Sequence, residues 1–136
     1  MSTVLGIGID ICDVHRMRRQ LDSPAAGFVE SVFLPAEIAY CQAKHHPEEH
    51  FAARFAAKEA VVKALALAGG EGAFWHDVEV VRTPDGAPAV VLHGRLRDLA
   101  AAAGVGIIHV SLTHTGTMAA AMAVADDSPA ATHGRT

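Results

Sequence analysis

The chain has 136 residues, of which 51% are hydrophobic, and this is enough for one domain with a sizeable core but too short for two. Its net charge of −4 gives no support for nucleic-acid binding through a broad basic surface, so an anionic partner must be met locally. No apolar run reaches the roughly 20 residues of a membrane span, and the N-terminus does not have the pattern of a signal peptide. With only two cysteines, Cys12 and Cys41, we expect a cytoplasmic protein with reduced thiols.

The first predicted element is a strand over residues 3–12, TVLGIGIDIC. Small and β-branched apolar residues occupy both of its alternating faces, which indicates a buried strand rather than an exposed one. Asp10 is the exception, because an acid in this setting either lies at an exposed strand end or is held for a purpose. The following residues, 13–21, predict a short basic helix with Asp13 as its N-cap.

Helices are predicted through the middle of the chain. Two short ones cover residues 24–33 and 35–44, and Pro35 separates them as a favoured first-turn residue. A loop containing HHPEEH follows. A longer helix then runs from about His50 to Ala68, where several glycines end it.

The rest of the chain predicts mainly strands. WHDVEVVR and AVVLHG form a hairpin around TPDGAP, and GIIHVSLTH and MAAAMAVA form a second hairpin across TGT. Between the hairpins, residues 95–103 predict a helix that Gly104 ends. Strands at both ends with helices between them argue for an α+β domain over residues 1–125, and the composition of residues 126–136 predicts a disordered tail.

The long predicted helix carries four charges, Arg54, Lys58, Glu59 and Lys63, among alanines, valines and phenylalanines. A helix that is apolar nearly all round packs on several sides, so its charges lie in interfaces or in a cleft. Glu59 and Lys63 have the spacing of an ordinary helix ion pair, worth about 0.3–0.5 kcal/mol. However, burial of a carboxylate is costly unless a cation compensates it, and this favours a functional role.

Asp10 and Glu59 come from separate elements and together could supply oxygen ligands to Mg²⁺. This ion typically takes one or two carboxylates and completes its octahedron with water and substrate phosphates. Lys63, next to Glu59 on the helix, would then face those phosphates. The ordinary helix pair remains the alternative on spacing alone.

Three motifs together resemble the holo-[acyl-carrier-protein] synthases, the small class of 4′-phosphopantetheinyl transferases. They are GIGIDICDVHRM (residues 6–17), FAARFAAKEAVVKAL (51–65) and IHVSLTHT (108–115), in the order and at the spacing of that family. The resemblance implies an antiparallel sheet with a long packed helix, and homotrimers with active sites between subunits. It also implies Mg²⁺-dependent transfer of the phosphopantetheine arm from coenzyme A to a serine of an apo acyl carrier protein. We expect fatty-acid biosynthesis, a part of lipid metabolism, as the setting.

The resemblance assigns catalytic roles to three residues. Asp10 and Glu59 match the family's metal ligands, and Lys63 matches its lysine next to the pyrophosphate. A serine hydroxyl must attack the β-phosphorus of a charged pyrophosphate, so catalysis consists mainly of positioning and of neutralising negative charge. A metal-bound water, Glu59 or Asp10 could act as the base.

Further residues have roles in binding by the same resemblance. His114 falls on the family's histidine near the nucleotide phosphates. Arg54 and Lys58 either line the nucleotide site or are structural, pairing with carboxylates of a neighbouring subunit. Ser111 points the same way as His109 from a predicted strand, toward a pocket or into a structural contact. The basic helix would receive the acidic helix of the carrier protein through three arginines: Arg16, Arg18 and Arg19.

Two other functions remain open from the sequence. A Mg²⁺-dependent nucleotide pyrophosphohydrolase would use the same Asp10, Glu59 and Lys63 but has no evident need for the basic helix. A non-enzymatic zinc module could use four soft ligands: Cys41, His45, His46 and His50. Pro47 argues against the single helix that such a module requires.

Overall fold

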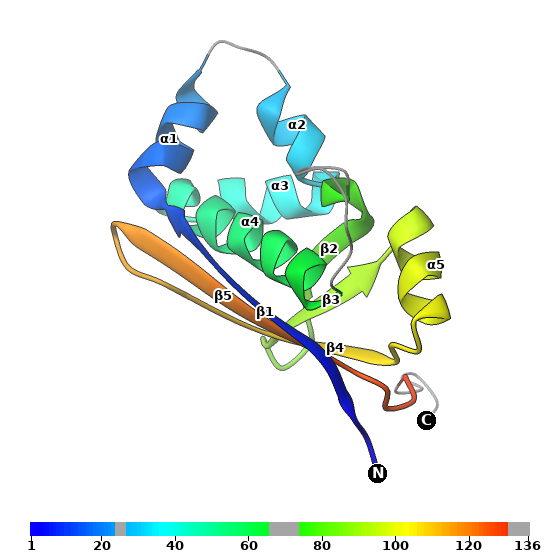
Figure 1. Ribbon diagram of the computed structural model, residues 1–136. Helices are drawn as coiled ribbons and strands as arrows, with labels where there is room; N and C mark the ends of the chain where they lie inside the picture. The colour runs from blue at the N-terminus through cyan, green and yellow to red at the C-terminus, as the bar shows by residue number, and fades with distance from the viewer. Residues whose placement is uncertain (24–26, 66–73, 131–136) are drawn as a thin grey trace.

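The long helix α4 (Pro47–Ala64) lies along one face of a three-stranded antiparallel sheet, in the spatial order β1 (Val4–Asp13), β5 (Met118–Asp126) and β4 (Ile107–His114) (Figure 1). This computed structural model describes residues 1–23, 27–65 and 74–130. The remaining elements are α1 (Val14–Asp22), α2 (Phe28–Val32), α3 (Pro35–Gln42), the 3-10 turn η1 (Trp75–Asp77), the hairpin of β2 (Val78–Arg82) and β3 (Pro88–Leu92), and α5 (Gly94–Ala102). The predicted α+β class is confirmed. Within the described ranges, no helix is both long and apolar enough to cross a membrane.

The start of α4 differs from the prediction. The helix begins at Pro47 rather than His50, so the second half of HHPEEH is helical and not a loop. Proline suits the first helical position, where no amide donor is needed, and Glu48 and Glu49 favour the positive end of the helix dipole. The helix ends at Ala64, with Leu65 as its C-cap, which is earlier than the predicted end at Ala68. The glycines predicted to end it lie outside the described residues, as does the predicted helical start at 24–26.

The predicted N-cap of α1 agrees with the structure. Asp13 caps α1, because its Oδ1 accepts a hydrogen bond from Arg16 N at 2.9 Å. β5 ends at Asp126, the first residue of the predicted tail, and Asp127 Oδ1 accepts a hydrogen bond from Thr3 N. Residues 131–136 of that tail lie outside the described part of the chain.

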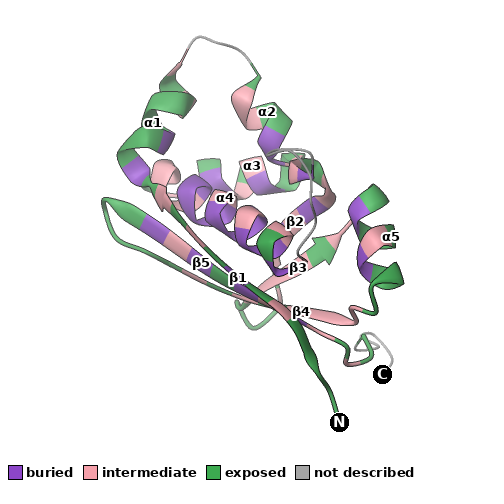
Figure 2. Cartoon of the chain, in the orientation of Figure 1, coloured by how far each residue is buried: buried purple, intermediate pink, exposed green. Residues whose placement is uncertain are grey.

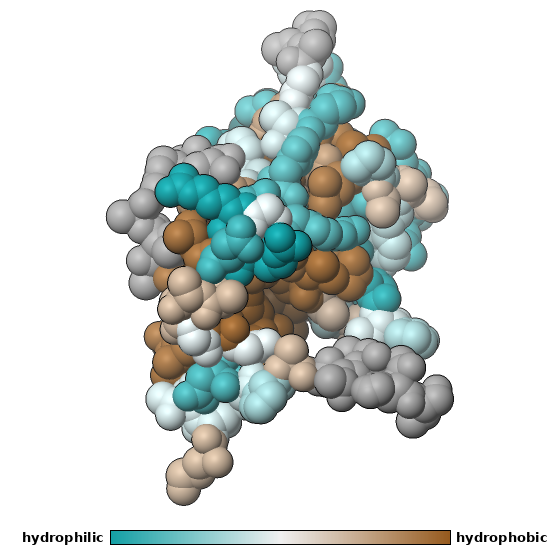
Figure 3. Space-filling model, turned by 90° about the vertical axis from the view of Figure 1, so that its right-hand side faces the viewer, coloured by the Kyte–Doolittle hydropathy of each residue, from teal (hydrophilic) through white to brown (hydrophobic). Residues whose placement is uncertain are grey.

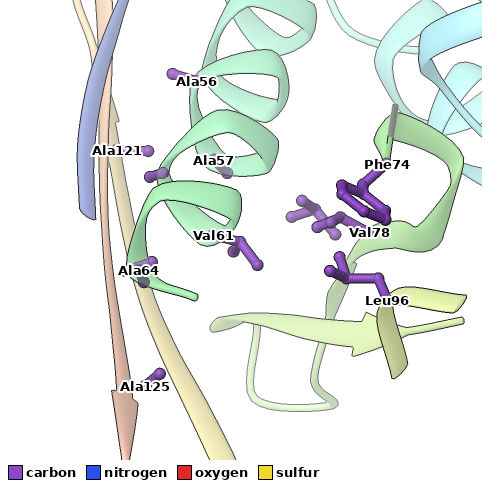
Figure 4. Close-up of a cluster of buried hydrophobic side chains, with 12 residues drawn as sticks. Ala56, Ala57, Val61, Ala64, Phe74, Val78, Leu96, Ala121 and Ala125 are labelled. Carbon is purple, nitrogen blue, oxygen red and sulfur yellow. The ribbon is translucent and has the colours of Figure 1, made fainter. Parts of the chain in front are cut away.

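Alanines form the contact between α4 and the sheet. In Figure 4 the helix presents Ala56 and Ala64 toward Ala121 and Ala125 of β5, while Val61 points toward the hairpin side of the core. These side chains are almost fully buried, and α4 is the most continuously buried element in Figure 2. Because small residues meet on both sides, the backbones of helix and strands lie close together.

The opposite face of the three-stranded sheet is left uncovered by the described elements (Figure 1). Ile7, Ile9 and Ile11 of β1 are 63–70% exposed there, and Met122 of β5 lies next to Ile9 in the register. The predicted burial of this strand is therefore wrong for a single chain. The side that packs on α4 is the one with Gly6, Gly8, Asp10 and Cys12, where small size allows close approach.

Candidate active site

A cavity of about 350 Å³ opens between β1, α1 and the middle of α4. Asp10 and Glu59 both line it, so the strand and the helix bring the two predicted metal ligands to one space. The rings of Phe28, Phe55 and Trp75 form an apolar side, with neighbouring ring centroids 5.7–6.3 Å apart. The other lining residues are Ile11, Cys12, Asp13, Arg16, Met17 and Gln20. The cavity therefore combines carboxylates, one arginine and aromatic surface.

Lys63 is bound to Asp10 at the edge of this cavity. Its Nζ donates to Asp10 Oδ1 at 2.9 Å and to Ile9 O at 3.0 Å. Asp10 pairs with Ala121 of β5, and the side chain of Ala121 is buried against α4. Because paired residues point to the same face of a sheet, the Asp10 carboxylate is directed toward the helix. The Lys63 side chain is 55% exposed, and exposed ion pairs add little to stability. Lys63 can therefore exchange Asp10 for another anion at low cost.

The donor set of the cavity fits Mg²⁺. Three carboxylates line the cavity, and one of them, Asp13, caps α1. The other two come from different elements and match the number of carboxylates that Mg²⁺ usually takes, with the other positions left for water and phosphate oxygens. Lys63 and Arg16 add positive charge beside the carboxylates, which suits an anionic substrate. Asp10 and Glu59 are thus the residues that would hold the ion.

Arg54 and His114 lie apart from this cavity, near the start of α4. Arg54 is 3% exposed, its guanidinium carbon lies 3.9 Å from the centroid of the Tyr40 ring, and its Nε has no hydrogen-bond partner among the described residues. His114 Nδ1 lies 3.0 Å from Glu49 Oε1, and its ring is 5.1 Å from that of His50. Within one chain, neither Arg54 nor His114 lines the cavity with Asp10.

Tyr40 was not predicted from the sequence, and three cations surround its ring, from the loop after α3, from α4 and from β2. Lys44, Arg54 and Arg82 all place their charges within 5.4 Å of its ring centroid. Burial raises the pKa of Tyr40, but these three cations outweigh burial and hold the pKa below its usual value. No local pattern links a tyrosine on α3 to an arginine on β2, so only the fold reveals this group.

Lys58 forms a structural ion pair, but with a carboxylate of its own chain rather than with one of a neighbouring subunit as predicted. Its side chain is fully buried, and its Nζ lies 2.7 Å from Glu37 Oε1 and donates to the carbonyl oxygens of Trp75 and Val78. Glu37 in turn accepts hydrogen bonds from two backbone amides, of which Val80 N lies at 2.8 Å. Burial lowers the pKa of Lys58, and Glu37 opposes that shift. The pair ties α4 to α3 and β2 in the same chain.

Ser111 and His109 share a face of β4, as the alternation predicts, and this face is the uncovered one. Ser111 pairs with Met122, and His109 Nε2 lies 2.8 Å from Asp126 Oδ2, which holds the pKa of Asp126 below its usual value. Both side chains therefore point away from the cavity of their own chain.

The three arginines of α1 have different surroundings. Arg16 lines the cavity, whereas Arg18 Nη2 lies 3.1 Å from Glu48 Oε1 at the start of α4. Arg19 is exposed in the last turn of the helix. Arg16 is thus the predicted docking residue that adjoins the proposed metal ligands.

The soft ligands of the zinc interpretation are dispersed. α3 ends at Gln42 and α4 begins at Pro47, so no single helix carries Cys41 and the three histidines, and burial raises the pKa of Cys41 to about 12. Nearby, ligand atoms of His46, Glu48 and Glu49 lie within 4.8 Å of one another. Glu48 already binds Arg18 and Glu49 binds His114, so this group is explained by ion pairs.

A second cavity has no acidic side chain among its described lining residues, unlike the first. Figure 3, which views the molecule from the right-hand side of Figure 1, shows apolar surface exposed between polar patches. Between β3, α5 and β4 lies a cavity of about 240 Å³, lined by Val90, Leu92, Arg97, Ala100, Ala101, Val105, Gly106 and Ile108. This lining includes no carboxylate, so it offers no acidic ligand to a metal.

An α+β fold with a carboxylate-lined cavity beside a basic helix defines a protein suited to a charged, phosphate-bearing substrate. Residues 6–124 match the family model of the 4′-phosphopantetheinyl transferase superfamily. The chain is 46% identical over 125 residues to the holo-[acyl-carrier-protein] synthase of Moorella thermoacetica, an alignment that covers 92% of this chain and 96% of that protein. The chain therefore belongs to the 4′-phosphopantetheinyl transferase superfamily.

Solved structures agree with this assignment. The holo-ACP-synthase of Plasmodium yoelii superposes with a TM-score of 0.79 at 27% identity, covering 94% of this chain and 98% of that one. The holo-(acyl-carrier-protein) synthase of Bacillus anthracis, solved in complex with CoA (3′,5′-ADP), gives a TM-score of 0.73 at 29% identity, covering 92% and 98%. Membership in this family of transferases displaces the non-enzymatic zinc interpretation.

Proposed function

We propose that the protein has holo-[acyl-carrier-protein] synthase activity. It transfers the 4′-phosphopantetheine group of coenzyme A to a serine of an apo acyl carrier protein and releases adenosine 3′,5′-bisphosphate. The observation that carries this proposal is the meeting of Asp10 and Glu59 at one cavity in a chain 46% identical to a holo-[acyl-carrier-protein] synthase. The setting is fatty-acid synthesis in the cytoplasm, and two free cysteines agree with a reducing compartment.

In the reaction, the serine oxygen forms a bond to the β-phosphorus as the bond to the leaving phosphate breaks. Asp10 and Glu59 would hold Mg²⁺, which when bound neutralises the pyrophosphate and stabilises the leaving group. Lys63 moves from Asp10 to the pyrophosphate and adds a second positive charge there. The serine proton goes to a carboxylate or to water at this site.

The nucleotide end of coenzyme A would bind to Arg54, His114 and Ser111. The buried, unpartnered Nε of Arg54 and the cations around Tyr40 support an anion site near the start of α4. Because this region is separate from the cavity of its own chain, it would complete the site of a neighbouring subunit. Residues 1–125 would form the catalytic domain and residues 126–136 its tail.

A homotrimer with active sites between subunits is therefore part of the proposal. The uncovered sheet face supports it, since a contiguous exposed apolar face on a soluble protein usually marks an interface. We expect Ile7→Lys to give a folded monomer by light scattering and to lower transfer activity more than about tenfold, because a charge there cannot be buried between subunits. Val91→Lys, an equivalent change on β3, should keep the assembly and the activity. A wild-type monomer with full activity would contradict the trimer.

Arg16, Arg18 and Arg19 would dock the acidic carrier protein. Arg16→Glu should raise KM for the carrier about tenfold, a larger effect than its effect on kcat, because charge reversal weakens the encounter with an acidic partner. Arg95→Glu, the same change on the exposed surface of α5, is the matched control. An unchanged KM in steady-state kinetics would move docking away from α1.

Intact-mass spectrometry of an apo acyl carrier protein, incubated with coenzyme A, Mg²⁺ and this protein, tests the activity. The expected result is a gain equal to one phosphopantetheine group on the carrier, and none with a chelator. Loss of coenzyme A without a gain in carrier mass would instead indicate the pyrophosphohydrolase. No change in either, with several carriers, would overturn the proposal.

A further inference from the structure

Two glycines of β1 make the closest backbone approach between the sheet and α4. A Cβ atom built on Gly8 would lie 2.0 Å from Ala60 O, 2.8 Å from Ala64 N and 2.9 Å from Lys63 Cβ. A Cβ on Gly6 would lie 1.9 Å from Ala64 O. Neither glycine has a positive φ, so neither is needed for an unusual backbone conformation. What each position requires is the absence of a side chain.

The contact at Gly8 lies beside the proposed metal ligands. Gly8 is two residues before Asp10 in the same strand and therefore on the same face, toward α4. The nearest of the three atoms that its Cβ would meet belongs to Ala60, the residue after Glu59, and another belongs to Lys63, which binds Asp10. The distance between Asp10 on the strand and Glu59 on the helix is thus set where Gly8 touches Ala60.

We infer that Gly8 is a positioning residue, whose missing side chain fixes the separation of Asp10 from Glu59 and thereby the size of the cation that the pair binds. This inference rests on the proposed function, since it takes Asp10 and Glu59 as Mg²⁺ ligands. Ordinary contacts of a Cβ atom begin near 3.4 Å, so alanine at position 8 forces strand and helix apart by more than 1 Å. The obstacle is helix backbone, which no rotamer change can move aside.

A wider gap changes which ion fits. Mg²⁺ requires ligand distances of about 2.0–2.1 Å in near-ideal octahedral geometry, whereas Ca²⁺ accepts about 2.3–2.6 Å and irregular geometry. Gly8→Ala therefore weakens Mg²⁺ binding more than Ca²⁺ binding. A variant that is merely less stable has no reason to change the ratio of the two affinities.

Gly6→Ala is the matched control. It makes the same substitution in the same strand, on the same face and against the same helix, with an equally short distance to a carbonyl oxygen. However, Gly6 meets Ala64, more than a helical turn beyond Glu59, and lies four residues from Asp10. Gly116→Ala, in a position with nothing within 4 Å, shows the effect of the substitution without a clash.

The experiment is calorimetric titration of Mg²⁺ and of Ca²⁺ into each variant with saturating coenzyme A, together with thermal unfolding. We expect Gly8→Ala to weaken Mg²⁺ binding about tenfold or more, since changes to the groups that orient metal ligands typically cost about 10- to 100-fold in metal affinity. The Ca²⁺-to-Mg²⁺ affinity ratio should rise. Gly6→Ala should lower the unfolding temperature to a similar extent and keep the wild-type ratio. Equal ratios in both variants would overturn the inference.

Two further measurements keep the outcomes separable. The wild-type protein should bind Mg²⁺ in the titration, and Asp10→Asn should abolish that binding. If either result fails, the proposed metal site itself is wrong, independently of the result for Gly8→Ala. If Gly8→Ala does not fold, Glu59→Asp draws one carboxylate back by a methylene group without touching the contact between β1 and α4. An unchanged Ca²⁺-to-Mg²⁺ ratio in Glu59→Asp would then overturn the link between separation and ion size.

Discussion

Replacing Glu59 with glutamine should lower kcat for phosphopantetheine transfer about a thousandfold or more and abolish its dependence on Mg²⁺. Removal of one group that stabilises developing charge typically costs about a hundred- to a thousandfold, and phosphoryl transfer depends almost entirely on such groups. Glutamine keeps the size of the side chain but not its negative charge, so the cavity retains its shape and loses one of the two proposed metal ligands. Asp10→Asn should behave in the same way.

Initial rates measured across a series of Mg²⁺ concentrations, with circular dichroism to verify folding, check this expectation. Asp98→Asn is the control, because Asp98 is an exposed acid on α5 whose side chain pairs only with Arg97 among the described residues. Near-normal turnover by Glu59→Gln at saturating Mg²⁺ would remove Glu59 from the metal site. Loss of folding would show instead that the carboxylate has a structural role.

Both acids of the proposed site stand out from their surroundings in the sequence. Asp10 ends the GxGxD pattern of a strand, Glu59 lies in a helix made mostly of alanines and other apolar residues, and the fold brings both to one cavity. The capped start of α1 is also visible locally, since Asp13 binds a backbone amide three residues away. Signals of this kind involve neighbours in sequence and need no knowledge of tertiary structure.

The orientation of β1 is not predictable from its composition. In GIGIDIC the isoleucines are the hydrophobic set, yet they are exposed, while the glycines face the core. The reason is that α4 packs so closely on β1 that only glycine fits between them. The isoleucine side of the strand is not covered within a single chain and is therefore available to another protein surface. The pairing of Lys58 with Glu37 is equally hidden, because the two residues are 21 positions apart and neither has a distinguishing local pattern.

Lys58→Met should destabilise the protein by about 3–5 kcal/mol, the cost typical of removing one partner from a buried ion pair. The Glu37 carboxylate would stay buried without its cation, and the carbonyl oxygens of Trp75 and Val78 would lose their donor. Small domains have about 5–15 kcal/mol in all, so much of the fold's stability depends on this pair. Urea denaturation measures the loss. Adding Glu37→Gln to Lys58→Met should restore part of it, since a neutral amide needs no cation.

Lys63→Met makes the same substitution on the same helix and should have the opposite profile. Its partner Asp10 and its own side chain are partly exposed, so the free energy of unfolding should change by less than about 1 kcal/mol. Turnover should fall at least about a hundredfold, because a cation beside the pyrophosphate is lost. Folded Lys58→Met protein at low temperature should in contrast keep its specific activity. If Lys58→Met instead lost activity at unchanged stability, Lys58 would belong to the active site rather than to the packing of α4 against α3 and β2.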